Sequence, residues 1–427
     1  MSDTATTAPP ATPPTVLRGR VVLPTRVEAD GVVVVDGTRI AWVGPAAAAP
    51  VPAPAPTDDV LLPGLVDLHC HGGGGVGFPD VTDAATAREA VAEHRRHGTT
   101  TLVASLVTAP AAVLLERVGV LAGLAAAGEV AGVHLEGPFL SAVRCGAQDP
   151  AHLLPGDPEL VRTCAEAARG HLVTMTVAPE VPGVDGPGGV VDALVDVGAV
   201  PSFGHTDASA EQTGVALARA GARLAARRPG ARPTVTHLFN GMPPMHHRSP
   251  GPVAACLAAA ARGEVVVELV ADGVHLDAAT VRTVLDVAAP DAVALVTDAM
   301  AAAGTPDGSY VLGGRRVRVR DGVARLAGDD DADDADDTDD TDDAADAADD
   351  APPGALAGGT AHLLDVVRRV VSSGVPLERA VRAAATTPAG VLGRHDVGAL
   401  EAGRRADVVV TGPDLRVRRV LVAGVVA

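Results

Sequence analysis

The sequence predicts an α/β protein, a (β/α)8 TIM-type barrel with a small β-sandwich domain built from both chain ends. The first observation is that, from about Leu61 onward, apolar runs of strand length alternate with helical stretches rich in Ala, Arg and Glu. This is the pattern of βα units on a parallel sheet. The second is that eight such units occur, and eight units over roughly 250–330 residues fit a barrel. The third is that short β-type runs lie at both ends of the chain.

The N-terminal part divides into a tail and a set of short strands. Residues 1–15 are rich in Pro, Thr and Ala and are expected to be disordered. The runs VLRGRVVLP, GVVVVDG and IAWVG follow, with turn residues between them, and this spacing indicates a small sheet. The closing segment of the chain has the same character. We therefore predict one small β domain from residues 16–60 and 395–427.

The barrel is predicted over residues 61–394. Each strand is a buried apolar run, and polar residues fall at the strand ends. The carboxyl ends of the strands form the catalytic face of such a barrel. The eight predicted strands begin at Gly64, Thr99, Val130, His171, Ala199, Arg232, Val265 and Asp291.

An acidic insertion interrupts the barrel at residues 329–353. The run from Asp329 to Asp350 holds fourteen Asp and no apolar residue larger than Ala, so it cannot bury enough surface to fold. We expect a solvated, disordered insertion, with a weak cation-binding or interaction segment as the alternative. The formal charge of the chain is −19, of which this run supplies −14, so the remainder carries only −5.

Composition excludes several classes of function. All 34 basic residues are Arg, which excludes a Walker-type phosphate lysine, a Schiff-base lysine and a carboxylated lysine bridging two metals. Without a basic patch interleaved with aromatics, we expect no nucleic-acid partner. Apolar runs of bilayer length and a targeting segment are both missing from the sequence, so we expect a cytoplasmic protein with no membrane partner. The four cysteines lack CxxC spacing and are expected to be reduced.

Polar residues at the strand ends indicate a metal site. His69 and His71 are two residues apart on a strand, so they point the same way and could chelate one metal. Glu136 ends an apolar run, where a charge is costly to bury unless a cation compensates it. His205 and His237, each by itself, could equally be hydrogen-bonded core histidines. With Asp298 at the end of the eighth strand, however, six such residues converge on one barrel mouth, which predicts a divalent metal site.

The residue types favour a particular chemistry. A bound metal lowers the pKa of water and polarises a carbonyl oxygen. Asp298 could accept the proton of that water and deliver it to the leaving group. Since this needs no nucleophilic Ser or Cys, the residues alone predict metal-assisted hydrolysis of an amide-like bond.

The motifs resemble those of the amidohydrolase superfamily and, within it, the N-acetylglucosamine-6-phosphate deacetylases. The resemblance covers nearly the whole chain from about Val16, apart from the acidic insertion, and HLEGPF with HLFNGM is its most diagnostic pair. It implies hydrolysis of N-acetyl-D-glucosamine 6-phosphate to D-glucosamine 6-phosphate and acetate, a zinc cofactor with one or two ions per subunit, and a homodimer. The supporting motifs are PGLVDLHCHGGGGVGF, GVHLEGPFLS, GHTDAS, THLFNGM, ADGVHL, VTDAM and GALEAGRRADVVV.

The same resemblance implies a role for each site residue. Glu136, His205 and His237 would bind the main metal, His69 with His71 would hold a second one, and Asp298 would be the catalytic acid and base. Arg248 would pair with the sugar phosphate, a bidentate contact that suits Arg. The residues implied to contact substrate are Ala147, Gln148, Asn240, Gly241, Arg248, Asp272, His275, Leu356, Ala357 and Gly358.

One departure and two alternatives stay open at this point. Many members have His where this chain has Gln148, a position implicated in holding the acetyl carbonyl. Gln can still donate a hydrogen bond there. The first alternative is a metal hydrolase of another N-acyl amino sugar or a cyclic amide. The second is a barrel that has lost catalysis and serves as a ligand sensor or scaffold.

Overall fold

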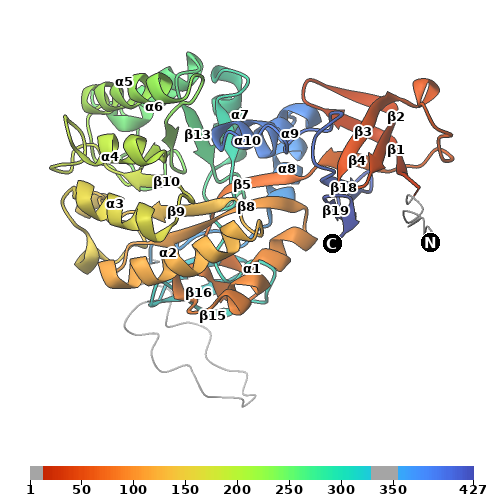
Figure 1. The fold of residues 1–427 in the computed structure, drawn as a ribbon. Helices are drawn as coiled ribbons and strands as arrows, with labels where there is room; N and C mark the ends of the chain where they lie inside the picture. Colours follow the sequence, from red (N-terminus) through yellow and green to blue (C-terminus); the bar gives the residue numbers. More distant parts are fainter. Residues whose placement is uncertain (1–12, 328–353) are drawn as a thin grey trace, which may run out of the picture.

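The fold is built around a parallel barrel sheet (Figure 1). The structure, a computed structural model, describes residues 13–327 and 354–427. The predicted N-terminal tail lies almost wholly outside these described residues, and the acidic insertion lies entirely outside them. All eight predicted barrel strands are confirmed and lie side by side in chain order. They are β5 (Leu65–Cys70), β8 (Thr99–Val107), β9 (Gly132–Glu136), β10 (Leu172–Val177), β11 (Val200–Phe203), β12 (Thr234–Val235), β13 (Val266–Leu269) and β14 (Val293–Leu295).

Helices cover the outside of the barrel, and several begin at residues that cap them. The side chains of Asp83, Asp157 and Asp277 accept backbone N–H bonds of the first turn, and Ser209 forms a capping box with Gln212. The helices are α1 (Ala84–Arg96), α2 (Ala111–Ala126), α3 (Pro158–Ala167), α4 (Val190–Val197), α5 (Ala210–Arg227), α6 (Gly251–Ala261), α7 (Ala278–Val287), α8 (Leu363–Ser372), α9 (Leu377–Ala384) and α10 (Thr386–Val391).

The barrel closes at a seam between its first and last strands. β5 and β14 are the two ends of the eight-stranded order. The residues just after β14 bridge the gap: the His71 N–H donates to the Ala299 carbonyl at 2.7 Å, and the Asp298 N–H donates to the His69 carbonyl at 2.9 Å. Thr297 Oγ1 donates to the buried Asp67 carboxylate at 2.6 Å. These contacts bring the ends of the first and eighth strands together.

The small β domain from both chain ends is confirmed. Its seven-stranded sheet has the order β20-β19-β18-β4-β1-β2-β3, so strands from the two ends of the chain pair with each other. It lies to one side of the barrel (Figure 1). The exact domain boundaries stay a prediction. The strands are β1 (Thr15–Leu23), β2 (Arg26–Asp36), β3 (Arg39–Pro45), β4 (Val60–Pro63), β18 (Val408–Thr411), β19 (Val417–Val422) and β20 (Val425–Val426).

A three-stranded antiparallel sheet was not predicted. It consists of β15 (Gly308–Leu312), β16 (Arg315–Arg320) and β17 (Val323–Leu326), inserted between β14 and α8. A short hairpin, β6 (Gly72–Gly73) with β7 (Val76–Gly77), follows the first barrel strand. Both insertions leave the barrel at the carboxyl ends of its strands, where the predicted site lies.

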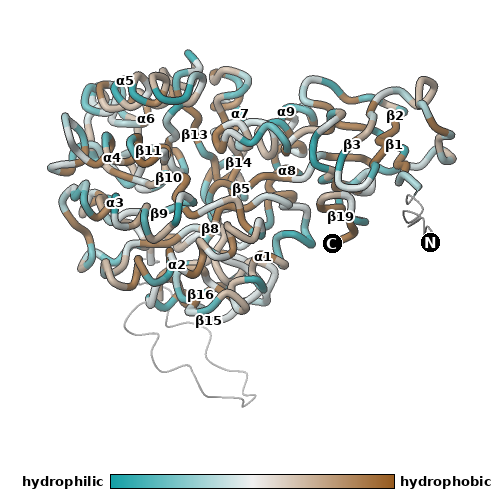
Figure 2. Tube along the Cα trace, in the orientation of Figure 1, coloured by the Kyte–Doolittle hydropathy of each residue, from teal (hydrophilic) through white to brown (hydrophobic). Residues whose placement is uncertain are grey.

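Hydrophobic side chains concentrate along the strands of the barrel and of the small sheet, while the outer helices and turns carry more hydrophilic residues (Figure 2). The large core side chains are mostly Val and Leu, with Phe78, Phe139 and Phe203 fully buried. Among the helices described, none combines the length and the apolar character that crossing a bilayer requires.

Candidate metal centre and active site

The six predicted metal-site residues meet at the carboxyl ends of the barrel strands. All six are buried. They fall into two groups of potential ligands, and within each group the ligand atoms lie within 4.8 Å of one another. The two groups are His69, His71 and Asp298, and Glu136, His205 and His237.

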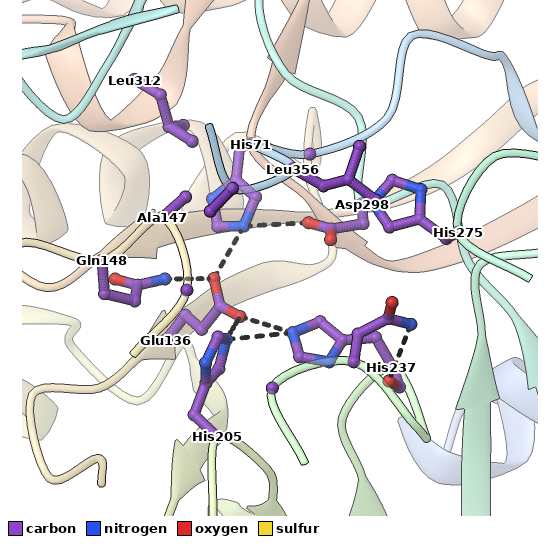
Figure 3. A pocket seen from close by; sticks show the side chains of 15 residues that line it. His71, Glu136, Ala147, Gln148, His205, His237, His275, Asp298, Leu312 and Leu356 are labelled. Atoms are coloured by element: carbon purple, nitrogen blue, oxygen red, sulfur yellow. Dashed lines mark hydrogen bonds and ion pairs between the residues drawn. The ribbon is translucent and has the colours of Figure 1, made fainter. Parts of the chain in front are cut away.

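Glu136 lies between the two groups and presents one carboxylate oxygen to each (Figure 3). Its Oε1 is 2.9 Å from Nε2 of both His205 and His237. Its Oε2 is 3.1 Å from Nε2 of His71. The carboxylate therefore has the position of a bridge between two cation sites.

The second group is equally compact. Nε2 of His69 and Nε2 of His71 are 3.0 Å apart, and Asp298 Oδ1 lies 3.4 Å and 3.3 Å from these two atoms. The His205 and His237 Nε2 atoms of the first group are 3.2 Å apart. Ligands of a tetrahedral zinc at about 2.0–2.1 Å would be separated by about 3.3 Å, so both groups have the spacing of a metal site.

Outer partners fix which imidazole nitrogen faces the centre. Nδ1 of His205 is 2.7 Å from the Arg144 carbonyl, and Nδ1 of His71 is 3.2 Å from the Ser105 carbonyl. Since a carbonyl only accepts, each Nδ1 carries a proton, and Nε2 is the nitrogen that faces the centre. An Nε2 at 2.9–3.1 Å from a carboxylate oxygen needs a positive charge between the two atoms, which a proton or a metal cation supplies. The donor set thus fits a divalent cation.

The electrostatics point the same way. Burial by itself would raise the pKa of Glu136, but the surrounding imidazoles, His69 foremost, hold it well below its ordinary value. Burial likewise opposes ionisation of Asp298, and His69 and His71 outweigh it to lower the pKa of that carboxyl. Both carboxylates are therefore ionised at neutral pH, and each buried negative charge is balanced by positive charge beside it, on the imidazoles or on a bound cation.

The backbone is strained where the site residues lie. His205, His237 and Asp298 have φ values of +48°, +27° and +49°, in or near the left-handed region that non-glycine residues rarely adopt. Such conformations cluster at functional sites because the surrounding structure must enforce them. Gly241 packs against the His205 ring, since a Cβ on Gly241 would lie 2.7 Å from His205 Nδ1.

A cavity of about 240 Å³ opens above the two ligand groups. Figure 3 shows predicted substrate residues around it, Gln148 and His275 among them. The cavity is also lined by Gly146, Leu312 and Ala355, which were not predicted from the sequence. The predicted substrate residues in its wall are Ala147, Gln148, Asn240, Gly241, His275, Leu356 and Gly358.

Three predicted substrate residues lie outside that wall. Asp272 is behind it, where its carboxylate accepts a bond from His275 Nδ1 at 2.8 Å and orients that ring. Ala357 is fully buried between two lining residues. Arg248 is exposed on the loop after β12. The roles assigned to these residues stay predictions.

Gln148 is held in one orientation by two hydrogen bonds. Its Oε1 accepts from the Thr108 N–H at 2.7 Å, and its Nε2 donates to Glu136 Oε2 at 2.7 Å. Because a backbone N–H can only donate, the amide nitrogen must face Glu136. Arg315 of β16 reinforces this loop by donating to the Ala147 and Gln148 carbonyls at 3.1 Å and 3.2 Å.

Comparison with known proteins identifies the family. A profile described as the amidohydrolase family matches residues 60–427. The chain belongs to the amidohydrolase family. This confirms the resemblance seen in the sequence and makes the chain a divalent-metal-dependent hydrolase, with the two ligand groups as candidate metal positions.

Individual relatives narrow the comparison. The N-acetylglucosamine-6-phosphate deacetylase of Bacillus subtilis (strain 168) is 35% identical over 64% of this chain and 66% of that protein. The N-acetylgalactosamine-6-phosphate deacetylase of Escherichia coli O157:H7 is 31% identical over 90% of this chain and 92% of that protein. A mutant of N-acetyl-D-glucosamine-6-phosphate deacetylase from Mycobacterium smegmatis, solved in complex with N-acetyl-D-glucosamine-6-phosphate, is 37% identical. It covers 97% of this chain and 99% of its own, with a TM-score of 0.82.

Proposed function

We propose that this amidohydrolase removes the acetyl group of N-acetyl-D-glucosamine 6-phosphate, giving D-glucosamine 6-phosphate and acetate. The main support is that the Glu136 carboxylate lies between the two ligand groups at the bottom of the cavity, and that Asp298 lines the same cavity. Relatives and a solved structure named for this reaction, which match most of the chain, support the substrate. This is hydrolysis of an unactivated amide, for which a buried site of metal ligands and one acid–base carboxylate is suited.

Zinc is the cation we propose, with one or two ions per subunit. Imidazole and carboxylate ligands at tetrahedral spacing support this choice. When bound, the cation supplies Lewis-acid polarisation of the amide carbonyl and acidifies the attacking water.

Asp298 carries the proton transfers in this proposal. It is ionised before the reaction because its pKa is lowered, so it can take a proton from the water that attacks the acetyl carbonyl. It then gives that proton to the sugar nitrogen as the C–N bond breaks. The products are acetic acid, which loses its remaining proton to solvent as acetate at neutral pH, and the free amine, and the Asp298 carboxylate is regenerated.

The substrate contacts follow from the cavity wall. We propose that His275, oriented by Asp272, and the Asn240–Gly241 turn bind the sugar, with Ala147 and Leu356 forming the apolar wall at the acetyl side. Arg248 is assigned to the phosphate. Its exposure on a loop beside the exposed Met245 supports a homodimer in which this loop completes a site. We also propose a cytoplasmic location, where a phosphorylated sugar is retained.

Acetate release tests the proposal. Purified protein is assayed with N-acetyl-D-glucosamine 6-phosphate as isolated, after chelation, and after zinc is restored. We expect activity to be lost on chelation and regained with zinc. Acetate release that is absent in every state would overturn the function, and release that survives full removal of metal would overturn the metal dependence.

The C4 epimer is the second candidate substrate, because one relative of nearly full coverage is named an N-acetylgalactosamine-6-phosphate deacetylase. The same assay with that epimer compares the two kcat/KM values. A higher value for the epimer would reassign the substrate and leave the reaction unchanged. The unphosphorylated sugar serves as the control for phosphate recognition, and Arg248→Ala should raise KM steeply for the phosphorylated substrate only.

A further inference from the structure

A third group of potential metal ligands lies outside the active site. Glu93, His97 and His362 place ligand atoms within 4.8 Å of one another. Glu93 Oε1 is 2.9 Å from His362 Nε2 and 3.1 Å from His97 Nδ1. The two imidazole rings are stacked, with centroids 3.6 Å apart and planes 12° from parallel. Glu93 Oε1 thus faces two imidazole nitrogens, one from near the start of the barrel sequence and one from near its end.

Backbone closes one side of the group, and the other side is open to solvent. The Glu93 and His362 side chains are 8% and 9% exposed, and that of His97 is 42% exposed. Gly304 closes one side with φ +80°, and a Cβ there would lie 2.2 Å from Glu93 Oε1 and 3.2 Å from His362 Nε2. The opposite side, at His97, opens into a solvent pocket that His362 and Asp365 also line.

Neighbouring charged side chains determine which atoms of Glu93 and His362 face the group. Asp365 Oδ2 is 3.6 Å from His362 Nδ1, the arrangement in which a carboxylate orients a metal-binding imidazole and leaves Nε2 as the ligand. Arg96 donates to Glu93 Oε2 at 2.5 Å and so leaves Oε1 to the histidines. His97 Nδ1 is also 2.9 Å from the Glu93 carbonyl, so a cation would displace its proton, as metal binding to His generally does. Because the nitrogen lone pairs lie in the ring planes, the His97 ring, which is 42% exposed, would also turn out of the stack to face the cation.

We propose that Glu93, His97 and His362 bind one divalent d-block cation, with zinc preferred. Two imidazoles and one carboxylate are a donor set that zinc accepts, and the pocket at His97 supplies room for water as a fourth ligand. The cation is separate from the active-site metals and does not depend on the function proposed above.

The place of this site gives the cation a role. Glu93 and His97 belong to the end of α1, which follows β5, and His362 precedes α8, which follows β14. The cation therefore connects the two helices on either side of the barrel seam. One turn from the site, His94 Nε2 lies 2.8 Å from the Gly72 carbonyl, just after His71. A cation here holds the end of α1 to the start of α8, beside the place where the first and eighth strands bring their active-site residues together.

Metal counting in a protein without active-site ligands tests the proposal. The background is the His69→Ala/His71→Ala/Glu136→Ala/His237→Ala variant of the full chain, which breaks both active-site ligand groups; it is saturated with zinc, desalted and measured by mass spectrometry of the metal. We expect this background to retain one equivalent through Glu93, His97 and His362. Adding His362→Ala or, at a more exposed position, His97→Ala should remove that equivalent. Adding His395→Ala, an exposed histidine in the loop after α10, should not.

A second readout separates binding from a general loss of structure. Zinc should raise the Tm of the background and of its His395→Ala derivative, since a ligand that binds the native state stabilises it. The His362→Ala and His97→Ala derivatives should fold without zinc and show no such rise. A background that retains no zinc, or an equivalent that survives both histidine substitutions, would overturn the proposal and leave the group as a hydrogen-bonded ion-pair cluster.

Discussion

Gln148 accepts a hydrogen bond from a backbone N–H and donates one to a carboxylate, so its amide has one satisfactory orientation. Its bond to Glu136 Oε2 fixes the carboxylate that both ligand groups share. One N–H of the amide nitrogen is bonded to Glu136, and the nitrogen has a second N–H. The expectation that Gln148 holds the acetyl carbonyl therefore stays a prediction that depends on this second donor. We interpret Gln148 in the free protein as a positioning residue for Glu136.

Truncation of Gln148 should weaken metal binding. Gln148→Ala leaves Glu136 Oε2 without its amide donor and the Thr108 N–H without its acceptor. Loss of such an outer partner typically costs about 10–100-fold in metal affinity. Competition with a chromophoric chelator measures this affinity. Gln212→Ala, which removes an exposed capping residue of α5, is the control, and equal metal affinity in the two variants would contradict the assigned role.

Asp298→Asn should remove the proton carrier while the other ligand group stays intact. We expect kcat to fall by about 10²–10⁴-fold, the range of general acid–base catalysis, with KM little changed. The zinc held by Glu136, His205 and His237 should remain, as metal analysis of the desalted variant would reveal. Full turnover by this variant would exclude Asp298 as the acid and base.

At this scale the sequence predicted that six polar side chains would meet, because their positions follow from topology; their role as a metal site stays a proposal. Residues that end parallel barrel strands must meet at one mouth, so His71 and Asp298 come together although they lie far apart in the chain. The partners of Gln148 and Asp272 could not be predicted in this way. They depend on the path of loops, which no periodicity encodes.

The β15–β17 sheet contributes to the site but was not predicted from the sequence. It brings Leu312 into the cavity wall and Arg315 to the loop that carries Gln148. Sequence signals for it exist: Gly313–Gly314 and Asp321–Gly322 are typical hairpin turns, and the run RRVRVR alternates in burial. The position of the sheet over the active site depends on tertiary packing, which these sequence signals do not encode.

Arg315→Ala should affect substrate binding more than stability. The variant loses two hydrogen bonds to loop carbonyls, so the loop that carries Ala147 and Gln148 loses support. We expect KM to rise about fivefold, the effect of about 1 kcal/mol, with kcat and Tm nearly unchanged. Arg318→Ala on the same strand is the matched control, since Arg318 donates to the exposed Ser309 instead. An unchanged KM, or an equal effect of both substitutions, would refute a positioning role for Arg315.

The whole molecule is a barrel joined to a sheet that both ends of the chain build. The fold class was predictable because eight apolar runs of strand length and two sets of short strands are legible without tertiary information. The cluster at the barrel seam was not. Glu93, His97 and His362 lie on helix ends rather than strand ends, and each residue is unremarkable in its own sequence context.

Acid should destabilise the segment between α10 and β18. Arg394 binds Asp396 with two bonds, of 2.7 Å and 2.8 Å, in the segment that joins α10 to β18. The hydrogen bond from Arg394 is the main reason that the pKa of Asp396 is lowered to about 2. The pKa in the unfolded chain is about 3.9, so this contribution to stability is complete above about pH 4 and is lost as the pH falls through about 2.

Urea unfolding of metal-free protein between pH 5 and pH 2.5 measures this loss. Asp396→Asn should be less stable than the parent at pH 5, with the difference shrinking toward pH 2.5. Asp414→Asn, at a turn of the small domain, is the control. A difference that stays constant over this range would show that the Asp396 charge does not contribute.

The pairing of β4 with β18 also has a consequence for synthesis of the chain. Pro63 pairs with Val408, so one edge of β4 waits for a partner that the ribosome makes 345 residues later. At about 5–20 residues per second this interval is roughly 20–70 s. During it, the nascent N-terminal strands present an open edge, and unpaired edges are templates for association with other chains. The last part of the chain to emerge therefore both completes the small sheet and ends this period of exposure.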